Sequence, residues 1–257
     1  MGIHLLDGRL VFGLFLGMLL LMDVGRRIGG RRLAHDPEGA RSGVGAVEGA
    51  VYGLLGLLIA FTFSGAASRF DTRRQLIVEE ANDIGTAYLR LDLLPAEPRD
   101  HLREQFRRYV DSRLETYRKF PDLQAVEAEL ARSIALQNEI WNLAVAATRD
   151  TPPPTTTLIL PALNQMIDIT TTRTAAARMH PPGVIFAMLG ALALIGSLMA
   201  GYGMAGGKTR SWLHMVAYAA ITAATAYVIL DLEYPRLGRI RLDAFDQVLV
   251  ELRQSMK

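Results

Sequence analysis

The chain has 257 residues, half of them hydrophobic, and a formal net charge of +2 at pH 7. So small a charge gives no electrostatic case for a nucleic-acid partner, and the absence of cysteine excludes disulfides and thiol catalysis. The hydrophobic residues concentrate in four blocks, whereas the charged residues gather between Arg69 and Arg178 and at the C-terminus. This distribution predicts an all-α membrane protein in which four transmembrane helices, arranged as two hairpins, flank an extramembrane helical domain.

The first apolar block, from Leu10 to Met22, predicts a membrane helix over about residues 4–24. Charged residues follow it without the small-residue cleavage pattern of a secretory signal, so we expect the helix to be retained. The next segment is the most basic short loop of the chain. Its glycines and Pro37 predict that no long helix forms there.

The second block, from Val44 to Ala67, holds a single charge. Roughly 20 helical residues cross a bilayer core of ~30 Å, so this stretch is long enough to span it. Its glycines recur three or four residues apart on one side of the helix, which predicts close packing against another helix. They are Gly45, Gly49, Gly53 and Gly56.

The single charge of this block is Glu48. An acid within a membrane helix costs about 2.5–3.5 kcal/mol or more unless it meets water, a partner or a proton. Two interpretations stay open: a packing helix whose Glu48 reaches for the interface, or a helix that lines an aqueous path. The substitution Glu48→Gln separates them, because only the second predicts altered conductance or selectivity.

No proline lies between Val44 and Leu94, so the second membrane helix is predicted to continue as one rod that ends at Pro95. Asp122 is expected to cap a later helix, and residues 151–157 are expected to form a linker. Helical periodicity predicts three helices after the rod, over about residues 99–120, 122–148 and 158–178.

Two further apolar stretches predict the second membrane hairpin, over about residues 183–204 and 212–232, with Asp231 as an acid at its end. The amphipathic tail is expected to form a last helix capped by Asp243. This helix is expected to pack against protein, because its polar side mixes acids and bases. These boundaries divide the chain into a first hairpin (1–67), a helical domain (68–181), a second hairpin (182–232) and a tail (233–257).

Two parts of the chain resemble the bestrophin-like family of bacterial membrane proteins: GAVYGLLGLLIAFTFSGAASRFDTRRQLIVEEANDIGTAYLRLDLLP and LDLEYPRLGRIRLD. The resemblance implies a distant relation to bestrophins, pentameric anion channels whose second helix lines the pore with an aromatic neck. It implies a homo-oligomer, a pentamer, in the bacterial cytoplasmic (inner) membrane. By the same resemblance the neck corresponds to Phe61 and Phe63, followed by Arg69 and Phe70.

The side of the membrane that holds the helical domain stays open. Basic residues of the short loops favour a domain outside the cytoplasm, whereas the resemblance implies a cytoplasmic one. Selectivity stays open too: the resemblance implies anions, but Glu48 favours cations. The chain is shorter than a bestrophin and lacks the acidic calcium clasp of bestrophins in recognisable form.

The main functional prediction is an oligomeric ion channel that contacts the lipid bilayer and inorganic ions and needs no cofactor. A ring of second helices would hold a hydrophobic constriction that gates by dewetting. Phe61 and Phe63 point in different directions on a helix, so they cannot line one narrow ring together, and either can instead pack against lipid or another helix. The predicted pore-lining or gate residues are Glu48, Tyr52, Ile59, Phe61, Thr62, Phe63 and Arg69.

Two alternatives remain. One is a membrane scaffold or signalling protein that transports nothing and whose helical domain docks a partner. The other concerns a local site: the cluster Glu79, Glu80, Asn82 and Asp83 has the oxygen ligands that Ca²⁺ prefers but lacks an EF-hand loop. The default expectation for it is a solvated or salt-bridged face with no metal. An enzyme is not expected, because no metal-ligand histidine spacing, P-loop, Rossmann pattern or nucleophile elbow is present.

Overall fold

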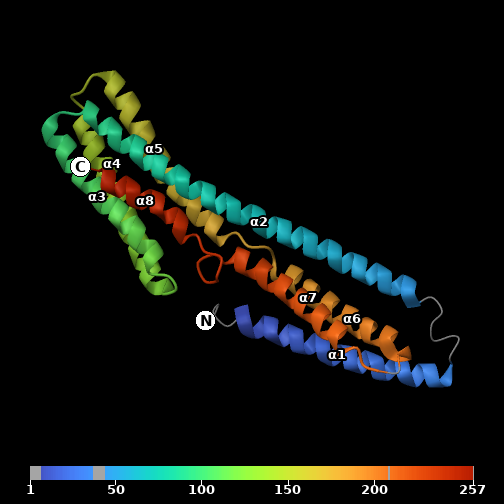
Figure 1. The fold of residues 1–257 in the computed structure, drawn as a ribbon. Helices are drawn as coiled ribbons and strands as arrows, with labels where there is room; N and C mark the ends of the chain where they lie inside the picture. The colour runs from blue at the N-terminus through green and yellow to red at the C-terminus, as the bar shows by residue number, and fades with distance from the viewer. Residues whose placement is uncertain (1–6, 37–43, 208, 257) are drawn as a thin grey trace. The chain divides into compact units, whose positions relative to one another are not determined.

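The structure, a computed structural model, describes residues 7–36, 44–207 and 209–256, and these contain helices and no strand. The predicted start at residue 4, Pro37 and the basic residues Arg41 and Lys208 lie outside the described residues. In chain order the α-helices are α1 (Asp7–His35), α2 (Val44–Arg90), α3 (Ala96–Arg118), α4 (Leu123–Thr148), α5 (Pro153–Arg178), α6 (Gly183–Gly203), α7 (Trp212–Glu233) and α8 (Asp243–Ser255) (Figure 1). Within the described part of the chain, four segments are long and apolar enough to cross a membrane: Gly8–His35, Gly45–Leu93, Pro153–Gly206 and Trp212–Glu233.

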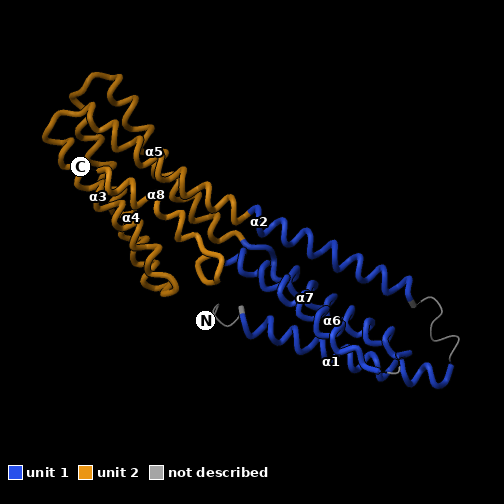
Figure 2. Tube along the Cα trace, viewed as in Figure 1, with its two compact units in different colours: residues 1–68, 180–234 blue, residues 69–179, 235–257 orange. Residues whose placement is uncertain are grey.

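The chain divides into two compact units (Figure 2). Residues 1–68 and 180–234 form the first, which we call the hairpin unit. Residues 69–179 and 235–257 form the second, which we call the polar unit. The helix α2 contributes to both, and it runs unbroken over 47 residues, as the absence of proline predicts.

In the hairpin unit, α1 continues to His35, so the prediction that no long helix follows residue 24 is wrong. Of the glycines in this segment, Gly29 packs against α6 instead: a Cβ on it would lie 2.7 Å from the carbonyl oxygen of Tyr202. A Cβ on Gly25 would lie 1.9 Å from the carbonyl oxygen of Leu198, and one on Gly201 would lie 2.0 Å from that of Met22. Because only glycine fits there, α1 and α6 pack backbone to backbone.

The basic residues at this end of α1 also have partners. Arg26 donates to the carbonyl oxygens of Gly207, at 3.0 Å, and Thr209, at 3.2 Å. Arg210 pairs with Asp23 at 2.7 Å. These bonds tie α1 to the turn between α6 and α7, and they favour continuation of the helix where the sequence predicts a loop.

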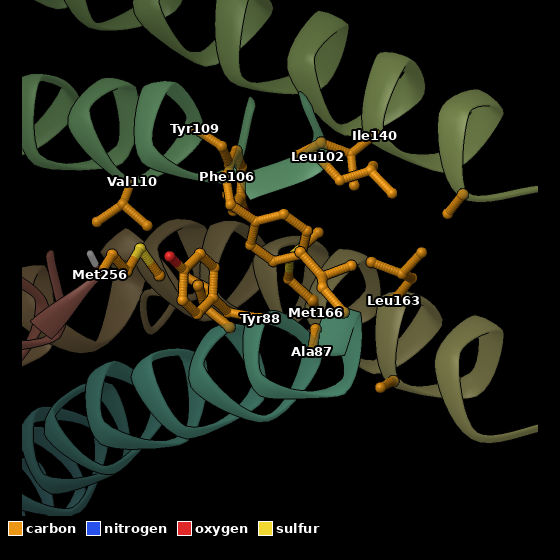
Figure 3. Packing of buried hydrophobic residues seen from close by; sticks show 14 of the residues in the cluster. Ala87, Tyr88, Leu102, Phe106, Tyr109, Val110, Ile140, Leu163, Met166 and Met256 are labelled. Carbon is orange, nitrogen blue, oxygen red and sulfur yellow. The ribbon is translucent and has the colours of Figure 1, made fainter. Parts of the chain in front are cut away.

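The core of the polar unit is apolar and is built from α2, α3, α4 and α5 together with the C-terminal segment (Figure 3). Tyr88 meets Phe106 edge to face, with ring centroids 5.9 Å apart. From the C-terminal segment, Leu249 is fully buried in the core, and Arg253 binds Asp111 of α3 with its Nε at 2.8 Å. The prediction that the tail packs against protein is therefore confirmed.

Three helix starts test the capping predictions. Asp122 accepts hydrogen bonds from the backbone of residues 124 and 125, so it caps α4 as predicted. The linker prediction is wrong over residues 153–157, because α5 begins at Pro153, where a missing N–H costs nothing. The capping prediction for Asp243 is also wrong: Leu242 holds the cap position, and Asp243 pairs with Arg241 at 2.7 Å.

Candidate functional site

The membrane half of α2 presents one open side. A Cβ built on any glycine of its stripe meets no atom within 4 Å; the four are Gly45, Gly49, Gly53 and Gly56. Among the described residues, no helix of the same chain packs against this stripe, so its packing against another helix stays a prediction. The close packing between α1 and α6 occurs at Gly25 and Gly201.

Aromatic and aliphatic side chains add to this exposed surface. Phe61 is 68% exposed and Phe63 is 42% exposed, and Leu54 and Leu57 are each about half exposed. Ile59 lies half-buried. The membrane half of α2 therefore leaves much of its apolar surface without cover from its own chain.

Glu48 and Tyr52 lie on a different side of α2 and face α6. A Cβ on Gly203 would lie 3.2 Å from Oε1 of Glu48, and this oxygen is buried without a hydrogen-bond partner among the described residues. The hydroxyl of Tyr52 donates to the carbonyl oxygen of Gly196 at 3.1 Å. Both predicted pore residues thus contact helices of their own unit.

Tyr218 of α7 completes this polar contact region. Its ring meets that of Tyr52 edge on, with centroids 6.3 Å apart. Its hydroxyl is buried, has no hydrogen-bond partner among the described residues, and would lie 3.2 Å from a Cβ on Gly196. We call Glu48, Tyr52, Gly196, Gly203 and Tyr218 the polar seam of the hairpin unit.

The other predicted site residues have partners already. The hydroxyl of Thr62 is buried and donates to the carbonyl oxygen of Leu58 at 2.7 Å, so it is bonded within its own helix. Arg69 is half-buried and Asp231 is buried, and each interacts with another residue.

The predicted cation cluster does not assemble. Glu79 and Asn82 are exposed, whereas Glu80 is fully buried and paired with arginines. No group of three or more acidic, histidine or cysteine side chains among the described residues is arranged to hold a metal ion. The expectation of a salt-bridged acid holds for Glu80.

The partners of Glu80 belong to a buried cluster that sequence reasoning missed. Arg113 donates from Nε to Oε1 of Glu80 at 2.6 Å, and Arg173 contacts Oε2. The guanidinium groups of Arg113, Arg173 and Arg236 lie 5.4, 4.6 and 4.6 Å from the ring centroid of Tyr117. We call Glu80, Arg113, Tyr117, Arg173, Arg236 and Asp246 the arginine–tyrosine cluster.

One signal in the sequence points to this cluster. Arg113 lies four residues after Tyr109 and seven after Phe106, on the helical face that forms the core of the polar unit. A charged residue at a core position predicts a buried partner. The partner itself lies 33 residues away, which local spacing cannot reveal.

A family model described as Bestrophin-like domain matches residues 12–244. The chain belongs to the bestrophin-like family. Two solved structures agree with this bestrophin-like fold, both single-substitution variants of a bacterial bestrophin homologue from Klebsiella pneumoniae. One matches with a TM-score of 0.70 at 16% identity, and the other with 0.71 at 15%; each match covers 94% of this chain and 98% of the other. A comparison with curated protein sequences found no match.

These findings confirm both the predicted family and the predicted fold class. This bestrophin-like chain is an all-α, multi-pass membrane protein with four candidate membrane spans.

Proposed function

We propose that this chain is one subunit of a homo-oligomeric ion channel in the bacterial cytoplasmic membrane, with the membrane half of α2 lining the pore. Membership of the bestrophin-like family supports an ion channel at the level of the family. One observation carries the assignment of the pore: the glycine stripe and Phe61 on α2 are left uncovered by the rest of the chain.

Lipid contact alone explains this surface poorly. A glycine in the middle of a helix costs roughly 0.5–1 kcal/mol relative to alanine, and a lipid-facing helix gains nothing in return. Glycines allow close approach of other helices, which a ring of identical helices around an axis requires. An exposed Phe61 supplies the large apolar side chain on which dewetting at a constriction depends.

We also propose that the permeant ions are anions. The single charge of residues 44–67 is Glu48, and it contacts α6 rather than the open side of α2. A ring of carboxylates along the pore therefore has no support from the geometry, and the family resemblance favours anions.

The test is reconstitution of the purified protein in planar bilayers, with native mass spectrometry to count the subunits. In asymmetric KCl we expect currents whose reversal potential lies toward that of chloride. A folded oligomer that carries no current would overturn the channel and favour the scaffold alternative. A reversal potential near that of potassium would overturn anion selectivity only.

A further inference from the structure

Exposed arginines gather at the C-terminal end of α1, in the hairpin unit. The side chain of Arg27 is 70% exposed, and Arg31, one turn further on, is also exposed. Arg31 forms no ion pair with any other described residue. Its charge is therefore open to a partner from outside the chain.

The turn between α6 and α7 adds a third arginine to this place. Arg210 pairs with one carboxylate oxygen of Asp23 at 2.7 Å, and Arg27 pairs with the other at 2.8 Å. One carboxylate thus holds two guanidinium groups close together. We call Arg27, Arg31 and Arg210 the arginine patch.

The acids near the arginine patch do not balance its charge. Residues 23–48 and 207–212 together hold seven arginines and lysines against four acids. One of these acids, Glu48, lies against Gly203 of α6. Asp23 is shared between two arginines, so an excess of positive charge remains after every acid of both segments has been counted.

The length of α1 places the arginine patch at the level of lipid headgroups. Arg27 lies about 28 Å further along the helix than Gly8, where the apolar span begins, and a bilayer core is ~30 Å thick. Trp212 is 53% exposed, and the guanidinium of Arg210 lies 5.6 Å from the centroid of its ring. An exposed tryptophan at the start of a membrane helix is typical of the same level.

An apolar strip on α1 leads directly to the arginines. Leu16, Leu20 and Val24 are 48%, 65% and 37% exposed. Arg27 and Arg31 follow them at intervals of three and four residues, so all five side chains lie on one side of the helix. A phospholipid molecule has the same order of parts, with its acyl chains followed by a phosphate.

We propose that the arginine patch binds the phosphate of an anionic phospholipid, whose acyl chains lie along Leu16, Leu20 and Val24. Arginine is well suited to this contact because its planar donors form paired hydrogen bonds with phosphate oxygens. Basic clusters beside a membrane helix attract anionic lipids. In a zwitterionic lipid the headgroup amine offsets the phosphate charge, so the excess of arginine favours an anionic lipid.

The direct test is native mass spectrometry of the full-length protein, released from detergent micelles that contain equal amounts of phosphatidylglycerol and phosphatidylcholine. We expect the protein to retain phosphatidylglycerol in preference, and Arg27→Gln/Arg31→Gln to reduce its affinity at least tenfold. Equal retention of the two lipids by the parent, or unchanged retention by the variant, would overturn the proposal. The result does not depend on whether the protein conducts ions.

Arg108→Gln/Arg118→Gln is the matched control, because it removes the same charge from exposed arginines of α3. Their side chains are 57% and 64% exposed and lie in the polar unit. This variant should retain phosphatidylglycerol as the parent does. An equal loss in both variants would show that the net charge of the protein, and not the arginine patch, determines retention, and would contradict the proposal.

Thermal unfolding separates a lipid from a free anion. We expect a saturable rise of the unfolding midpoint when phosphatidylglycerol is added to the micelles, and no rise with the same concentration of soluble glycerol phosphate. An equal rise with glycerol phosphate would mean that the acyl chains contribute nothing, and would overturn the lipid as the ligand. If Arg27→Gln/Arg31→Gln does not fold, this comparison and the lipid preference of the parent still decide.

A lysine variant tests direct contact with the phosphate. Arg27→Lys/Arg31→Lys keeps the charge but loses the paired donors, so its affinity for phosphatidylglycerol should lie between those of the parent and the glutamine variant. An affinity equal to that of the parent would contradict a phosphate bound by the guanidinium groups.

Discussion

The carboxylate of Glu48 lies against Gly203 of α6: a Cβ on this glycine would come within 3.2 Å of Oε1 and 3.4 Å of Oε2. The acid is thus accommodated because α6 has no side chain at that position. Its contact with α6 places it away from the open side of α2, where the proposed pore lies. In the sequence, Glu48 favoured cation selectivity. In the structure, its carboxylate is part of the packing between α2 and α6.

We predict that Glu48→Gln leaves the reversal potential in asymmetric KCl unchanged and raises the unfolding midpoint, because a buried carboxylate oxygen without a partner is destabilising. Bilayer recordings and thermal unfolding of the same preparation check both parts. Glu79→Gln, at an exposed acid of the same helix, should change neither quantity. A changed ratio of anion to cation permeability in Glu48→Gln would place this acid beside the permeant ions.

Phe61 is predicted to be the main constriction. Phe61→Ala should raise the single-channel conductance by about tenfold, since each ~1.4 kcal/mol removed from a barrier is a factor of ten in rate. The matched control is Phe12→Ala on α1, where the side chain is 60% exposed and belongs to the same unit. Equal conductance in the parent and both variants would exclude Phe61 from the narrow part of the pore.

Gly25→Ala should destabilise the hairpin unit by about 1–3 kcal/mol, because the new methyl group would overlap the carbonyl oxygen of Leu198 and push α1 from α6. Thermal unfolding in detergent measures the loss. Gly30→Ala is the control, since Gly30 lies on the same helix and a Cβ there meets nothing within 4 Å. It should leave the protein as stable as before or slightly more stable. An equal loss in both variants would contradict the overlap with Leu198 as the cause, because a Cβ at Gly30 meets nothing within 4 Å.

The elements that were predicted well have local causes. Proline-free sequence and Pro95 define the rod of α2, and the Asp122 cap depends on residues two and three positions away. Apolar periodicity predicted a helix over about residues 99–120, and α3 spans Ala96–Arg118, because helical spacing is itself local.

The elements that were predicted wrongly depend on contacts distant in sequence. Gly29 helps to predict a loop in the sequence, because its close contact with Tyr202 of α6 is too distant along the chain to be foreseen. The buried state of Glu80 depends on Arg113 and Arg173, from two other helices. In the same way, the side of α2 on which Glu48 lies could be derived, but the presence of α6 on that side could not.

The last prediction concerns pH and the buried contact between α3 and α4. Glu129 accepts hydrogen bonds from Ser112, at 2.8 Å, and from Lys119, at 2.5 Å. Burial raises the pKa of Glu129, but the bonds from Lys119 and Ser112 and the charges of Lys119 and Arg132 outweigh it, so the pKa falls below its usual 4.5. The folded state therefore binds the proton less readily than the unfolded state does, and the stabilisation is complete above the unfolded pKa.

Glu129→Gln should cost about 1–3 kcal/mol at pH 7, and the difference from the parent should shrink as the pH falls below about 4.5. Thermal unfolding midpoints of both proteins between pH 3.5 and 7 check this. Glu127→Gln, at an exposed position of the same helix, should follow the parent at every pH. A difference between the parent and Glu129→Gln that grows in acid would mean that the carboxylate destabilises the fold, because its burial would then outweigh its bonds to Lys119 and Ser112.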